Sequence, residues 1–136
     1  MDPARYLALF VEEAADHLGE MGRAFLALEK EPASAEALET CFRMAHSIKG
    51  MAASMHFDPI AARAHALEDR LQLARGAGRV DAVSELPRWF SMLDGLERLI
   101  STVRDTGQCP TTPEPPGAGA DAAGLKKKLR TPPLAA

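Results

Sequence analysis

Aromatic residues are scarce in this sequence. They make up 5% of the 136 residues, whereas 46% of the residues are hydrophobic, chiefly alanine, leucine and methionine. Strands favour aromatic and β-branched residues, while alanine, leucine and methionine are good helix formers. The composition therefore argues against a β-sheet protein and predicts an all-α fold, and the length leaves room for one domain of ordinary size.

Other features that are missing exclude further classes of protein. No run of 18 apolar residues is present that would span a membrane, and the start lacks the basic and apolar regions of a signal peptide. The only cysteines are Cys41 and Cys109, so a disulfide framework is not implied. The net charge is −3, and the residues after 105 are more basic than acidic, so residues 1–105 are more acidic than the whole chain. An acidic domain binds the phosphate backbone poorly. We therefore expect a cytoplasmic protein that binds neither membranes nor nucleic acid.

Four helices are expected from apolar spacing and start signals. Asp2 and Pro3 begin the first, which ends near Lys30. Ser34 is an N-cap candidate for the second, and Asp58 with Pro59 repeats the cap-and-proline signal for the third, which stops around residues 76–78. The fourth begins near residue 81 or 84 and ends at about residue 105. Because the connections are short, the helices should form an antiparallel up-down-up-down four-helix bundle.

The expected core residues recur at helical spacing along these four segments. They are Leu7, Val11, Ala14, Leu18, Met21, Phe25, Leu28, Leu38, Cys41, Phe42, Ala45, Ile48, Ala52, Met55, Ile60, Ala64, Leu67, Leu71, Ala74, Leu86, Phe90, Leu93, Leu96, Ile100 and Val103, with Trp89 as a partly buried anchor.

The last part of the chain has a different character. Residues 106–136 hold six of the ten prolines and four of the ten glycines. This segment is interpreted as a flexible linker or tail, with room for a short basic helix at residues 125–130, and it suggests that the chain is a piece of something longer.

Polar residues on the second helix single out His46. It lies at the edge of the apolar stripe, in one row with Glu39, Arg43 and Gly50, and is expected to be accessible. A glycine within a helix costs about 0.5–1 kcal/mol relative to alanine. The presence of glycine at position 50 would be explained if it lets another protein surface come close to His46. The side chain of Lys49 can reach the same part of the surface.

The third helix should bring further polar groups to His46. A hairpin that turns around residues 56–57 places residue 46 level with residue 67, where His65 and Glu68 share one helical face. His46, Lys49, His65 and Glu68 are therefore expected to converge.

Such a cluster suits phosphoryl transfer through nitrogen. A carboxylate that accepts a hydrogen bond from Nδ1–H fixes the imidazole tautomer and leaves Nε2 as a nucleophile. Glu68 is the candidate for this carboxylate, while Lys49 and His65 can offset the charge of an incoming phosphoryl group. No residue binds ATP, so the phosphoryl donor and its metal ion should come from a partner.

The stretch Phe42-Arg43-Met44-Ala45-His46-Ser47-Ile48-Lys49-Gly50 resembles the phosphoacceptor motif of histidine phosphotransfer (HPt) domains, more narrowly those of CheA-type chemotaxis histidine kinases. The segment Ala64-His65-Ala66-Leu67-Glu68-Asp69-Arg70-Leu71 is similar to the second motif of that family, and the resemblance covers roughly residues 5–105. It implies a phosphorylation site at His46, hydrogen bonded to Glu68 and supported by Lys49 and His65. Ala53 and His56 depart from it, because relatives often have glycine there.

The resemblance also implies the partners. The phosphoryl donor would be an ATP- and Mg²⁺-binding kinase domain, on the same polypeptide or on another. The acceptor would be an aspartate of a CheY- or CheB-like response regulator, which holds its own Mg²⁺. Helical spacing suggests Arg43, Ser47, Gly50 and Ser54 as the residues that contact a partner.

Blander interpretations remain for several of these residues. His17 and His56 are expected to be ordinary solvated side chains, and Glu68 has Arg63 as an alternative partner.

Two other functions compete with phosphotransfer. One is a metal-binding bundle, although a single His65–Glu68 pair cannot build a two-metal cage and no metal site is predicted. The other is a helical adaptor in which His46 is incidental.

Overall fold

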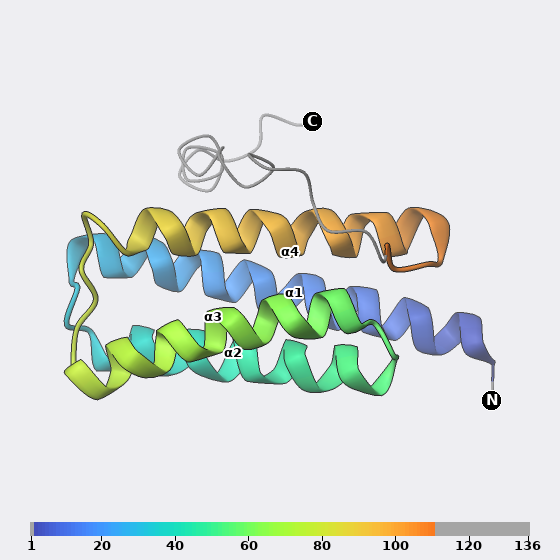
Figure 1. Ribbon diagram of the computed structural model, residues 1–136, viewed down its shortest axis with the longest axis horizontal. Coiled ribbons are helices and arrows are strands. Elements are labelled where there is room, and N and C mark those ends of the chain that lie inside the picture. The colour runs from blue at the N-terminus through green and yellow to red at the C-terminus, as the bar shows by residue number, and fades with distance from the viewer. Residues whose placement is uncertain (1, 111–136) are drawn as a thin grey trace.

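The computed structural model describes residues 2–110 as four α-helices joined by short connections (Figure 1). The helices are α1 (Pro3–Lys30), α2 (Ala35–Ser54), α3 (Asp58–Ala77) and α4 (Leu86–Thr106). Within residues 2–110 there is no strand, and consecutive helices run antiparallel. The predicted all-α four-helix bundle is confirmed. Residues 111–136, which hold most of the predicted tail and its basic helix at 125–130, lie outside the described residues.

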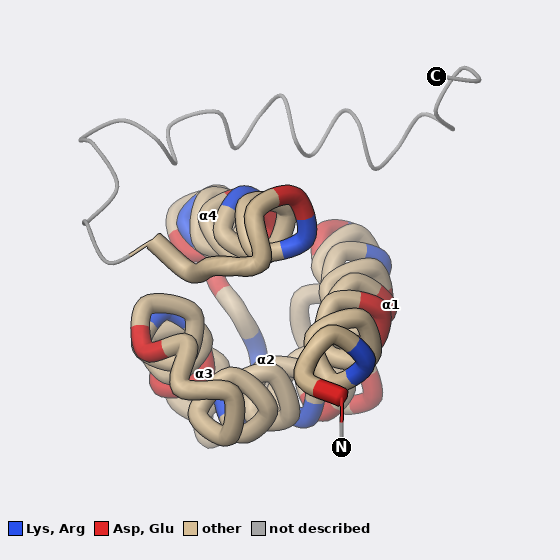
Figure 2. The backbone as a smooth tube through the Cα atoms, turned by 90° about the vertical axis from the view of Figure 1, so that its right-hand side faces the viewer, with Lys and Arg blue, Asp and Glu red and all other residues tan. Residues whose placement is uncertain are grey.

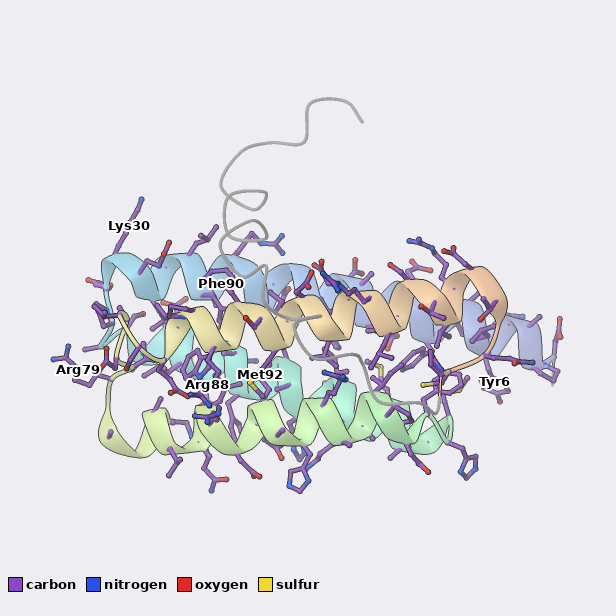
Figure 3. All side chains as sticks on the ribbon, turned by 45° about the horizontal axis from the view of Figure 1, so that its top comes forward. Tyr6, Lys30, Arg79, Arg88, Phe90 and Met92 are labelled. Carbon is purple, nitrogen blue, oxygen red and sulfur yellow. The ribbon has the colours of Figure 1, made fainter. Side chains whose placement is uncertain are left out.

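The four helices form a closed ring around one core. α2 and α4 each pack against both α1 and α3, and the end-on view in Figure 2 shows the four helices around a common centre. Lys30 and Arg79 point outward at one end of the bundle in Figure 3, as most charged side chains do. No helix in the described part of the chain is both long and apolar enough to cross a bilayer.

Two of the predicted helix starts are confirmed and two are shifted. The Asp2 side chain accepts a hydrogen bond from the backbone N–H of Ala4, and the Ser34 hydroxyl accepts one from Ala37, as expected of N-caps. Asp58 is not the cap of α3. It is the first helical residue and makes no side-chain cap bond, although its charge still favours the positive end of the helix dipole.

The start of α4 lies later than predicted. Asp81 belongs to a turn before the helix, where its carboxylate accepts hydrogen bonds from the backbone N–H groups of Val83 at 3.0 Å and Ser84 at 3.1 Å. These bonds lower the pKa of Asp81 below its ordinary value. Aspartate signals both turns and helix caps, and here the turn is formed.

The predicted core residues are buried, with four exceptions that are half-buried at the rim: Leu7, Val11, Phe42 and Met55. Trp89 was predicted to be partly exposed and is fully buried, with its ring centroid 5.5 Å from that of Phe25. The indole N–H donates to Glu85 at 2.9 Å, and Arg70 of α3 binds the same carboxylate oxygen at 2.6 Å. A buried indole therefore has its polar partner.

The predicted hairpin at residues 56–57 is confirmed, and it sets the register of α3 against α2. His56 adopts a left-handed backbone conformation with φ of 60°, and Phe57 donates its backbone N–H to Ala52 at 2.9 Å. The Phe57 ring packs edge-on against Phe10 of α1 at 5.2 Å. The turn is thus fixed to the core, and α3 runs back along α2 from this point.

Candidate functional site

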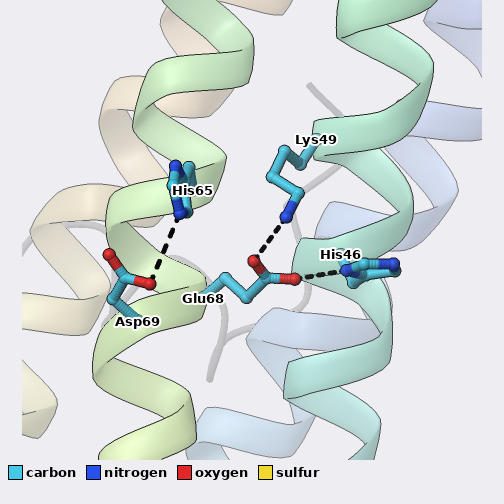
Figure 4. Close-up of polar contacts among 5 residues, drawn as sticks. All are labelled: His46, Lys49, His65, Glu68 and Asp69. Carbon is cyan, nitrogen blue, oxygen red and sulfur yellow. Dashed lines mark hydrogen bonds and ion pairs between the residues drawn. The ribbon is translucent and has the colours of Figure 1, made fainter.

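An exposed histidine on α2 is bonded to a buried carboxylate on α3. The side chain of His46 is 64% exposed, whereas that of Glu68 is 8% exposed. One oxygen of Glu68 accepts a hydrogen bond from Nδ1 of His46, and the other accepts one from Nζ of Lys49 at 2.6 Å (Figure 4). Glu68 therefore reaches across the interface between two helices and binds two side chains of α2.

The charge of Glu68 is compensated although the residue is buried. Burial by itself would raise the pKa of the carboxyl group. The hydrogen bonds from Lys49 and His46, together with the positive charge of Lys49, outweigh that effect and hold the pKa of Glu68 below its ordinary value. The carboxylate is thus ionised at neutral pH and acts only as an acceptor.

This acceptor determines the tautomer of His46. Nδ1 must carry the proton that is donated to Glu68, so Nε2 of the neutral imidazole holds the lone pair. Figure 4 shows the far edge of the ring directed away from α3, where it is open to a partner. The arrangement supplies an oriented nucleophile on the surface of the bundle.

Phe42 also orients the ring, which the sequence did not indicate. It lies one turn before His46, and the two rings are parallel within 10° with centroids 6.2 Å apart. The guanidinium of Arg75 on α3 lies 3.7 Å from the centroid of Phe42 and binds Glu39 at 3.1 Å. The i, i+4 spacing of Phe42 and His46 was the available signal, but Phe42 was assigned to the core stripe.

His65 does not reach His46 as predicted. It is 59% exposed on α3, and its Nε2 lies 3.5 Å from the carboxylate of Asp69. The structure therefore brings together three of the four predicted site residues, namely His46, Lys49 and Glu68, with His65 beside them (Figure 4). A supporting role for His65 stays a prediction.

The predicted partner-binding residues lie around His46. Arg43 and Ser54 are exposed, and a side chain added at Gly50 would meet no atom within 4 Å, so the surface there is open. Ser47 is half-buried because its hydroxyl faces α1, where Nε2 of His17 lies 3.0 Å away. His17 was expected to be a solvated side chain, and this expectation was wrong.

One group of side chains in the described part of the chain has the composition of a metal site. His65, Glu68 and Asp69 each offer a ligand atom, and these atoms lie within 4.8 Å of one another. Both oxygens of Glu68, however, already serve His46 and Lys49. A metal ion at this position would have to compete with the contact that orients the imidazole.

Taken together, the fold and the site define a four-helix module with an exposed histidine that a buried carboxylate orients. The Hpt domain family model matches residues 5–106, and the chain belongs to this family. The resemblance of the sequence to HPt domains is thereby confirmed.

The chain is similar to chemotaxis proteins named CheA. The chain is 36% identical over 103 residues to the chemotaxis protein CheA of Halobacterium salinarum, covering 75% of this chain and 15% of that protein. It is 35% identical over 108 residues to CheA of Bacillus subtilis, covering 79% and 16% respectively. The chain thus spans a small part of the length of these relatives.

Solved structures agree with this assignment. The CheA phosphotransferase domain from Thermotoga maritima superposes with a TM-score of 0.70 and 31% identity, covering 76% of this chain and 99% of that one. The phosphorylated P1 domain of CheA3 in complex with CheY6 from R. sphaeroides superposes with a TM-score of 0.70 and 25% identity, covering 93% of each chain.

Proposed function

We propose that this chain is the phosphotransfer module of a CheA-type chemotaxis histidine kinase and acts in the cytoplasm, with His46 as the phosphoacceptor. The observation that supports this most strongly is the hydrogen bond from Nδ1 of the exposed His46 to the buried carboxylate of Glu68. Exposure of His46 matters because the phosphoryl donor and the phosphoryl acceptor must each reach Nε2, one after the other.

In the first step the lone pair on Nε2 of His46 attacks the γ-phosphorus of ATP. An N–P bond forms, the O–P bond to the β-phosphate breaks, and ADP leaves. Nδ1 keeps its proton, so the ring becomes a cation that the Glu68 carboxylate stabilises. ATP and Mg²⁺ are supplied by a kinase domain, on the same polypeptide or on another. The site that binds the nucleotide provides most of the electrostatic stabilisation in phosphoryl transfer.

In the second step an aspartate of a CheY- or CheB-like response regulator attacks the same phosphorus. The new bond joins the phosphoryl group to an aspartate oxygen, and the N–P electrons return to Nε2. The regulator supplies the Mg²⁺. The complex formed by the related P1 domain of CheA3 with CheY6 supports a partner of this kind. Arg43, Ser47, Gly50 and Ser54 are the proposed contact residues.

Lys49 and His65 have supporting roles in this proposal. Lys49 fixes the position of the Glu68 carboxylate, because its Nζ donates to a carboxylate oxygen at 2.6 Å. The remaining N–H groups of Lys49 can donate to the phosphoryl oxygens. His65 lies on the same side of the site, beside Asp69.

A discharge experiment tests the proposed relay. The chain is labelled with radioactive ATP by a CheA-type kinase domain, freed of kinase and nucleotide, and mixed with a CheY-like regulator and Mg²⁺. We expect the label to leave the chain and to appear on the regulator, but not on a regulator whose acceptor aspartate is replaced by asparagine.

The His46→Gln variant separates this function from that of an adaptor. We expect it to take up no label, while its helical content is unchanged. Equal labelling of the variant and the wild type would overturn the proposal, and so would a labelled chain that transfers nothing to any chemotaxis regulator.

A further inference from the structure

The direction of the free nitrogen of His46 follows from its hydrogen bond. Nδ1 faces Glu68 on α3, and Nε2 is separated from Nδ1 by Cε1 with its lone pair in a different direction, so Nε2 is turned away from Glu68 (Figure 4). The helices next to α2 are α1 and α3. A phosphoryl group on Nε2 would therefore extend over the surface of α2 toward its α1 side.

On that side α1 contributes a polar contact next to His46. The half-buried His17 places its Nε2 3.0 Å from the hydroxyl of Ser47, the residue that follows His46. This contact joins residues 30 positions apart in the chain. The phosphotransfer function described above makes no use of His17.

A phosphoryl group needs several hydrogen-bond donors, and on the α3 side one N–H of Lys49 already donates to Glu68. The phosphoryl group carries a charge of about −1.5 to −2 and three acceptor oxygens. The charge of Lys49 is already balanced by Glu68 at 2.6 Å, and His65 faces Asp69 at 3.5 Å. A hydroxyl has one proton and two lone pairs, so when Nε2–H of His17 donates to Ser47, the proton of Ser47 is left to donate outward.

We propose that His17 is a positioning residue for phosphoryl transfer, which fixes the Ser47 hydroxyl so that it donates to the phosphoryl group on Nε2 of His46. The inference rests on the proposed role of His46 as phosphoacceptor. It extends the site from two helices to three, because α1 takes part through His17 without contacting the phosphoryl group itself.

The first test is spectroscopic and needs no kinase. The whole chain is phosphorylated with phosphoramidate, which transfers phosphate to accessible imidazoles, and the histidine ring signals are followed by ¹H–¹³C correlation NMR. The same treatment of His46→Gln identifies the changes that arise at His46. We expect the ring signals of His17 to shift more than those of His65 and His56. A larger shift of His65 than of His17 would overturn the proposal.

The second test measures transfer. After removal of phosphoramidate, the labelled chain is discharged to a CheY-like regulator. We expect His17→Leu and Ser47→Ala each to slow the discharge severalfold and His17→Gln, whose amide can donate to Ser47, to restore most of the rate. Asp16→Asn, an exposed neighbour on α1, serves as the matched control and should discharge at the wild-type rate.

A double variant shows whether His17 acts through Ser47. The combination of His17→Leu with Ser47→Ala should be no slower than Ser47→Ala alone, since residues that act as one unit are not additive. Additive effects, or unchanged rates in both single variants, would contradict the proposal. If a kinase domain fails to label His46, the proposed function fails, while the NMR comparison still decides the role of His17.

Discussion

At the scale of single residues, the chemistry of His46 depends on one buried carboxylate. Glu68 is the one charged residue that is buried within the described part of the chain, with 6% of its surface exposed. A buried charge is unfavourable unless it is paired and hydrogen bonded, and both oxygens of Glu68 meet that condition. The ionised carboxylate in turn orients the imidazole of His46 through its hydrogen bond with Nδ1.

Removal of this carboxylate should slow phosphorylation. We expect Glu68→Ala to accept phosphate from a CheA-type kinase domain severalfold or more slowly than the wild type, because the ring loses its orientation and the cation its counter-charge. Initial rates of label uptake measure the effect. Gln72→Ala, an exposed change one turn further along α3, is the control. An unchanged rate in Glu68→Ala with unchanged helicity would contradict the role of Glu68.

The same carboxylate should make stability depend on pH. The pKa of Glu68 is lower in the folded state than its ordinary value, which is about 4.3 in unfolded chains. Between these two values the unfolded state binds more protons, so the contribution of Glu68 is fully present above the ordinary value and is lost as the pH falls through the folded value. Denaturant unfolding of the wild type and Glu68→Gln over pH 2–7 measures it. The difference in unfolding free energy should shrink toward low pH, and a difference that grows would contradict this account.

The residues of the site were predictable to different degrees. His46, Lys49 and Glu68 follow from helical spacing and one hairpin, since both depend only on positions along two consecutive helices. The contact of Ser47 with His17 depends on how α1 is rotated and shifted against α2, which spacing within one helix does not contain. The stacking of Phe42 on His46 depends on side-chain rotamers at the rim of the core.

At the scale of elements, the connections decide where the site forms. The turn between α2 and α3 places Glu68 opposite His46, and it includes a histidine with φ of 60°. A non-glycine residue in this conformation is strained by about 1–2 kcal/mol.

Replacement of His56 by glycine should therefore stabilise the domain. The relief of backbone strain exceeds the extra entropy of glycine in the unfolded chain, so we expect His56→Gly to gain about 0.5–1 kcal/mol. Gly78→Ala is the opposite control, because Gly78 has φ of 80° and open space around it, so only backbone strain is added. Thermal unfolding measures both. A loss of stability in His56→Gly would show that the histidine makes a compensating contact.

Helix boundaries show why local signals are not enough. Asp58 and Asp81 both looked like caps, yet one lies inside its helix and the other in a preceding turn. An aspartate side chain accepts hydrogen bonds from backbone N–H groups both at helix caps and in turns, and the packing of the helices selects between the two. Apolar spacing was the better guide, because it reflects the burial that stabilises the helices.

At the scale of the whole molecule, the four-helix bundle supports one exposed group, the imidazole of His46. The ring of four helices with Trp89 and Phe25 at its centre supplies a rigid base, and Nε2 of His46 lies on its surface. The bundle could be predicted from the sequence because four amphipathic segments with short connections have few ways to bury their apolar faces. The partners could be inferred only from the resemblance, since their binding sites belong to other domains.

The central claim is that His46 carries the phosphoryl group, and phosphate incorporation tests it most directly. The chain and its His46→Gln variant are incubated with ATP, Mg²⁺ and an active CheA-type kinase domain, and the stability of the bound phosphate is measured in acid and in alkali. The account predicts phosphate that is labile in acid, stable in alkali and absent from the variant. Phosphate that is stable in acid, or that appears equally on the variant, would contradict it.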